Sequence, residues 1–154
     1  MDSALGTYPK GWNRTMAMHK EEQIQLRLSI ARDKLSVAVG LLRNGHYGDA
    51  ISKAYYAMFY AGKALLLALD QDPHKHKGVV TMFGEKIARV GLTDPRYGRT
   101  LAKAERLRID ADYNEQYLAT KEDAEKAIHD AEDFVNEAHA TLKKIQARGK
   151  NHVH

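Results

Sequence analysis

Cysteine is missing from all 154 residues of this chain, and tryptophan occurs only once. Without cysteine the protein has no disulfide, no thiolate nucleophile and no cysteine-ligated zinc site. No apolar run approaches the roughly 18–20 residues that a membrane-spanning helix needs. The first residues also lack the basic-then-apolar order of a signal peptide. We therefore expect a cytoplasmic protein that does not enter a membrane.

A strong charge bias is missing too, since 24 basic residues against 20 acidic ones leave a net charge of +4. The charges are mixed along the chain, and such a slightly basic surface permits contact with nucleic acid without requiring it. Glycine-rich phosphate loops, nucleophile elbows and His-Glu-x-x-His zinc motifs are absent as well. We predict no cofactor and no metal site.

Much of the chain shows the apolar periodicity of α-helices, and this periodicity is strongest over residues 47–69. Apolar residues there follow one another at alternating steps of four and three, which is typical of one helical face. Further apolar positions widen this face beyond half of the helix circumference, as expected for a helix in the middle of a bundle. The residues of the main face are Ile51, Tyr55, Met58, Gly62, Leu65 and Leu69.

Four more helices are predicted from the same spacing, at about 16–43, 77–90, 95–112 and 120–148. Strand-like alternation is absent, and the short link before residue 47 makes the first two helices an antiparallel hairpin. The predicted fold class is all-α, an up-and-down four-helix bundle with an additional fifth helix. We expect residues 16–148 to form this single domain, with a loose leader at 1–15 and a tail at 149–154.

Three sequence pieces, in the same order and spacing, resemble motifs of the HEPN domain family, the higher-eukaryote and prokaryote nucleotide-binding domains. The matching helical pattern extends over about 24–145. The resemblance implies a small homodimeric helical bundle, often encoded beside a minimal nucleotidyltransferase in toxin–antitoxin or nucleic-acid defence systems. The pieces are Ala50-x-Ser52-x-Ala54-Tyr55-Tyr56-Ala57-Met58-Phe59-Tyr60-Ala61, His76-Lys77-Gly78-Val79 with Phe83, and Arg108-Ile109-Asp110-Ala111-Asp112-Tyr113.

The resemblance also implies a catalytic group made of Arg108, Asp112 and Tyr113. Many family members are metal-independent ribonucleases with an arginine, four intervening residues and then a histidine, a position that Tyr113 takes here. An unperturbed phenol has a pKa of about 10 and is a poor base near neutral pH. Arg108 still suits a phosphate or a phosphorane-like transition state. From spacing alone, Arg108 and Asp112 are equally compatible with an ion pair on a helix surface.

Three more residues are candidate ligand-binding positions: Lys53, Tyr56 and His76. Lys53 stands where the family often has arginine, and Tyr56 either stacks on a base or belongs to the core or a dimer interface. His76 either caps the third helix, lines the cleft, or supplies the imidazole missing at Tyr113. A metal on His74 and His76 is disfavoured because lysines flank them.

Three functions are compatible with these residues. The favoured one is a nucleotide- or RNA-binding module that partners a minimal nucleotidyltransferase in a toxin–antitoxin or defence system. The second is a ribonuclease toxin that uses Arg108 with Tyr113 or a histidine. The third is a structural homodimer without a ligand.

Overall fold

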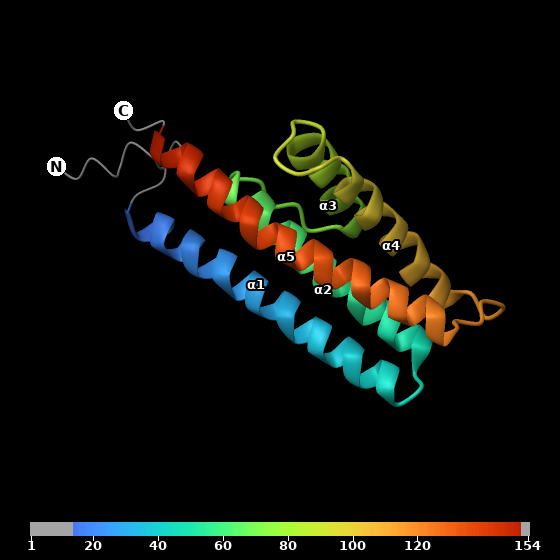
Figure 1. Cartoon of the computed structure of the whole chain (residues 1–154). Coiled ribbons are helices and arrows are strands. Elements are labelled where there is room, and N and C mark those ends of the chain that lie inside the picture. Colours follow the sequence, from blue (N-terminus) through green and yellow to red (C-terminus); the bar gives the residue numbers. More distant parts are fainter. Residues whose placement is uncertain (1–13, 152–154) are drawn as a thin grey trace.

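The computed structural model describes residues 14–151, which form α-helices and contain no strand (Figure 1). Of the predicted leader and tail, residues 1–13 and 152–154 lie outside this range, whereas 14–15 belong to α1 and 149–151 to α5. The elements are α1 (Arg14–Arg43), α2 (Tyr47–Ala68), α3 (His76–Phe83), the π-helical η2 (Gly84–Ala88), α4 (Arg96–Tyr113) and α5 (Lys121–Asn151).

The helices run up and down, as Figure 1 shows. Helices α1 and α4 run in one direction, while α2 and α5 run in the opposite one. The short α3 with η2 is the additional element, placed between α2 and α4 in the chain. The predicted all-α, up-and-down bundle is therefore confirmed.

Helix α2 is the centre of the bundle, because it contacts α1, α3, α4 and α5. Most of its side chains are buried, including the bulky Tyr55, Met58 and Leu65. Alanines and Gly62 fill the remaining inward positions and let neighbouring backbones approach, so that the Gly62 backbone lies against Phe83. The apolar residues predicted around most of α2 are thus buried against neighbouring helices on several sides.

Two predicted helix boundaries are made by the expected residues. After α1, Gly45 adopts φ +79°, and the N–H of His46 donates to the carbonyl of Leu41 at 2.9 Å. Only glycine adopts this left-handed conformation without a steric cost. Before α5, the N–H of Asp123 donates to the Thr120 hydroxyl, and the Thr120 N–H donates back to the Asp123 carboxylate, both at 3.1 Å. This is the reciprocal capping box expected from the sequence.

The third predicted helix differs from the structure in its second half. A regular helix was expected at about 77–90, but the α-helical part ends at Phe83 and η2 continues as a wider π-helical turn. The N–H of Arg89 donates to the carbonyl of Gly84 at 2.9 Å, which spans five residues. A Cβ on Gly98 would lie 3.1 Å from the Ala88 Cβ, so α4 packs tightly against this turn. Periodicity alone does not report such a local widening.

Leu65 tests the assignment of α2 as the central helix. We expect Leu65→Ala to lower the free energy of unfolding by about 2–5 kcal/mol, because a fully buried leucine leaves a cavity. Chemical denaturation followed by circular dichroism measures this change. The control is Lys126→Ala, at an exposed position of α5, which should change stability by less than about 0.5 kcal/mol. Equal effects of the two substitutions would contradict the central position of α2.

Candidate functional site

Arg108 lies on the inner side of α4, not on the helix surface. Only 8% of the residue is exposed, and its guanidinium carbon lies 5.2 Å from the ring centroid of Tyr55 and 5.8 Å from that of Tyr56. These distances are those of cation–π contacts, so the two tyrosine rings of α2 contact the positive charge of Arg108. The ion pair of Arg108 with Asp112 predicted from their spacing is present, but its arginine is buried instead of lying on the helix surface.

Asp112 is the carboxylate nearest to this arginine. Its Oδ2 lies 3.7 Å from Arg108 Nη1, which is longer than a hydrogen bond, and the same oxygen accepts from the Ser52 hydroxyl at 3.3 Å. The Nε of Arg108 is buried and has no hydrogen-bond partner among the described residues. The guanidinium is thus removed from water while its donors are only partly satisfied, an arrangement that costs free energy.

His76 joins this cluster from the start of α3. Its Nδ1 lies 2.8 Å from the Tyr55 hydroxyl, and its ring stacks on Phe59 with centroids 4.4 Å apart. The ring of Tyr56 meets it edge-on at 5.6 Å. His76 does not cap α3, since that N-terminus has no side-chain cap. Its position lines the site, and its imidazole lies close to the same tyrosine as Arg108.

Burial and the neighbouring charges shift two pKa values in the cluster. Burial raises the pKa of the Tyr55 phenol, Glu105 adds to this effect, and the positive Arg108 opposes it. Burial lowers the pKa of His76, and Arg108 and Lys63 lower it further while Glu105 works against them. The physical result is a protonated phenol beside a neutral imidazole at neutral pH.

Lys53 lies beside the cluster, whereas Tyr113 lies outside it. The Nζ of Lys53 lies 5.9 Å from the Tyr56 ring centroid, so this lysine stands at the edge of the cluster. Tyr113 ends α4 and is 74% exposed, with no hydrogen bond or ring contact found to any residue of the described range. The structure therefore brings Lys53, Tyr56, His76, Arg108 and Asp112 together and leaves Tyr113 outside the group. Their functional roles stay predictions.

Two neighbours received no role from the sequence, Ser52 and Glu105. Ser52 lies within the first motif, and its bond to Asp112 ties α2 to α4. Glu105 is three residues before Arg108, a spacing that places both on one side of α4. The spacing of Glu105 and Arg108 can be read from the sequence. That the Glu105 charge acts on Tyr55 follows only from the fold.

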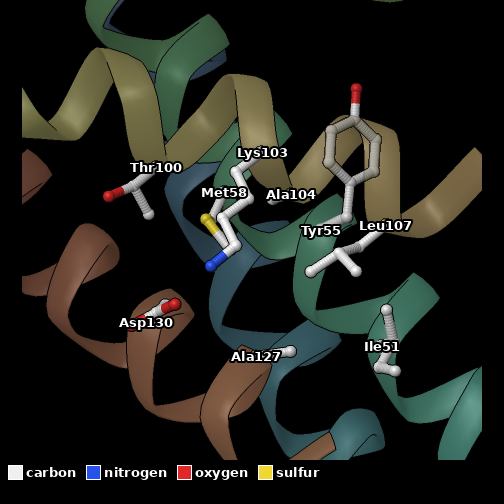
Figure 2. A pocket seen from close by; sticks show the side chains of 9 residues that line it. All are labelled: Ile51, Tyr55, Met58, Thr100, Lys103, Ala104, Leu107, Ala127 and Asp130. Atoms are coloured by element: carbon white, nitrogen blue, oxygen red, sulfur yellow. The ribbon is translucent and has the colours of Figure 1, made fainter. Parts of the chain in front are cut away.

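Two hollows of the described surface differ from this cluster in size and charge. A cavity of about 20 Å³ between α2, α4 and α5 has room for a single water molecule. Figure 2 shows the Tyr55 ring at its side, with the hydroxyl directed away from the other labelled side chains. A larger hollow of about 380 Å³, where α1 begins and α2 ends, contains two ion pairs, Lys20 with Asp70 at 2.6 Å and Arg27 with Asp72 at 2.9 Å. Its cations are already neutralised.

Within residues 14–151, no three histidine or acidic side chains lie close enough together to hold a metal ion. No helix of that range combines the length and the apolar character needed to cross a bilayer.

The fold and the three motif pieces define the class of protein, and comparison with known families agrees. The model of the HEPN domain matches residues 24–143, so the chain belongs to the HEPN domain family and the resemblance is confirmed.

Three relatives each cover 80–90% of this chain. A Methanocaldococcus jannaschii protein named "Putative toxin MJ0605" is 43% identical over 80% of this chain and 92% of its own length. A second protein of that organism, "Putative toxin MJ0142", is 30% identical over 90% of this chain and 95% of its own. A "UPF0332 protein" of Archaeoglobus fulgidus is 33% identical over 80% of this chain and 98% of its own.

The imidazole of His76 reports the charges of the site. We expect its pKa to lie below the ordinary value of about 6.5. Arg108→Gln removes a positive neighbour and should raise the His76 pKa, whereas Glu105→Gln removes a negative one and should lower it further. Titration of the His76 ring signals by NMR measures both changes. Shifts of the same sign in the two variants would contradict the described placement of these charges.

Proposed function

We propose that this chain binds a phosphate group of a nucleotide or RNA strand at Arg108, as a module of a toxin–antitoxin or defence system. The observation that carries the proposal is the buried guanidinium whose Nε has no partner within the described chain. An arginine held in this way recovers hydrogen bonds when an anion arrives, and phosphate matches its fork of donors. The names of the two toxin-like relatives support the biological setting.

The outward strip of α2 supports a nucleic-acid or nucleotide ligand over a bare anion. Lys53, Tyr56, Tyr60 and Lys63 follow one another at steps of three, four and three, and all four are partly exposed. The strip therefore carries two aromatic rings between two positive charges. Aromatic rings stack on bases of any sequence, while lysines attract the phosphate backbone. Such a surface suits a flexible single strand or a mononucleotide.

Binding without cleavage is favoured over ribonuclease activity. Metal-independent cleavage needs a base for the 2′-hydroxyl in addition to a cation for the phosphate. Tyr113, which replaces the family histidine, is exposed and stands apart from the Arg108 cluster. The second candidate, a ribonuclease toxin, is retained because Arg108 and an imidazole are nevertheless close to the same tyrosine.

Assembly is the second part of the proposal. We propose a homodimer, and a minimal nucleotidyltransferase as the protein partner, as the family resemblance implies. Three large apolar side chains near the end of α4 and in the following loop are exposed: Ile109, Tyr113 and Leu118. Apolar surface gathered at one end of a helix is typical of an interaction site.

Arg108→Gln tests the binding site. We expect wild-type protein to bind a fluorescently labelled oligouridylate with an affinity that falls as salt rises, because phosphate contacts release counterions. The variant should lose about tenfold or more in affinity, the usual cost of a charged hydrogen-bond donor. Fluorescence anisotropy measures both. Arg106→Gln is the matched control, an exposed arginine on the same helix whose loss should change affinity little.

The same preparations separate the three functions. Incubation of the oligonucleotide in excess chelator should leave it intact with the wild type, while Tyr113→His restores the family spacing and is expected to raise cleavage. Robust cleavage by wild type that disappears in Arg108→Gln would establish the ribonuclease instead. Absence of binding by every preparation would favour the structural homodimer.

Light scattering tests the assembly. We expect a particle of twice the 17.4 kDa chain mass at micromolar concentration. Ile109→Glu places a charge in the proposed interface and should shift the particle towards the monomer. Leu26→Glu, at an exposed apolar position of α1, is the control and should leave the dimer intact. A monomeric wild type would refute the dimer, and an Ile109→Glu dimer would refute this interface.

A further inference from the structure

We propose that His76 is the second anion-binding group of the Arg108 site, and that Tyr55 fixes it as the tautomer with the proton on Nε2. This inference rests on the proposed function, because it names the group that meets the phosphate beside the arginine. It assigns His76 the role of a hydrogen-bond donor, not of the missing base. The ligand class is a phosphate ester with unprotonated oxygens.

The orientation of the His76 ring is determined by three aromatic neighbours from α2. Phe59 stacks on its face, with an angle of 28° between the planes. Tyr56 meets it at 76°, and the Tyr55 hydroxyl lies 2.8 Å from its Nδ1. The His76 ring is thus held by a stacked ring, an edge-on ring and a hydrogen bond, which leave it little rotational freedom. Nε2, separated from Nδ1 by one ring carbon, has no hydrogen-bond partner among the described residues.

The direction of the Tyr55–His76 hydrogen bond follows from the groups on the other side of the phenol. Arg108 lies against the same ring at 5.2 Å and carries only N–H donors. It can offer a proton to the phenol oxygen but cannot accept one. The phenol keeps its proton, since burial raises the pKa of Tyr55. The Tyr55 O–H therefore donates to His76 Nδ1, and a neutral imidazole that accepts at Nδ1 carries its proton on Nε2.

The charged and titratable groups that face His76 come from α2 and α4. They are Tyr55, Tyr56 and Lys63 from α2, and Glu105 and Arg108 from α4. Burial, together with the positive charges of Arg108 and Lys63, outweighs Glu105 and lowers the pKa of His76, so the free site holds the imidazole neutral. A bound phosphate adds negative charge and stabilises the imidazolium, which raises the pKa of His76. Proton uptake then accompanies binding, and by linkage the affinity increases as pH falls through the interval between the free and bound pKa values.

The tautomer is measured first, by long-range proton–nitrogen NMR correlation on protein labelled with ¹⁵N-histidine, above the pKa of His76. We expect the wild type to show a protonated Nε2 and an unprotonated Nδ1. Tyr55→Phe keeps the buried ring and removes the hydroxyl, so the two tautomers should mix. A wild-type ring protonated on Nδ1 would overturn the proposal, whether or not the protein binds RNA. Circular dichroism verifies that Tyr55→Phe remains folded.

Anion contact is measured next, with labelled oligouridylate and with inorganic phosphate as separate probes. His76→Gln keeps an N–H donor and should retain most of the affinity while losing its pH dependence. His76→Leu has no donor and should lose about tenfold or more. Equal affinities of wild type and His76→Leu, with Arg108→Gln still impaired, would overturn the role of His76 and leave the proposed function standing. Failure of wild type to bind either probe would overturn both.

Discussion

Burial of Tyr55 in the middle of the bundle is the constraint on which the candidate site depends. Its ring belongs to the hydrophobic core and is fully enclosed, while its hydroxyl meets His76 and its face carries Arg108. Because α2 is surrounded by α1, α3, α4 and α5, this ring cannot turn without opening the core. The same packing that stabilises the fold therefore holds an arginine from α4 and a histidine from α3 in one place.

The buried charge of Arg108 lowers the stability of this arrangement. A guanidinium among tyrosine rings has exchanged its hydration for two ring contacts and a carboxylate beyond hydrogen-bond distance. A core built for stability alone is better served by an apolar residue of similar size at that position. The neighbouring Asp112 is itself held by Ser52, so it is not free to move closer without losing that bond. The proposed phosphate ligand would complete the hydrogen bonds of this charge.

Sequence patterns predicted the bundle well because helix formation is encoded locally. The glycine after α1 and the Thr120–Asp123 capping box act within a few residues, and each appears in the structure as expected. The π-helical turn of η2 was missed because it arises where α4 packs closely on Ala88, a contact between residues distant in sequence. Burial of Arg108 was missed for a similar reason. A pattern of charges four residues apart does not tell which side of a helix faces the core.

The sequence by itself determined the family, the central helix and the list of candidate residues, since motif spacing and apolar periodicity are properties of the chain alone. Only the tertiary structure decided which of those residues share a site. It placed His76 against Tyr55 and Arg108 over the same ring, and it left Tyr113 exposed at the end of α4. The physical reason is that these positions belong to three separate helices. Their distances are set by how the helices pack around α2, and local sequence does not encode those distances.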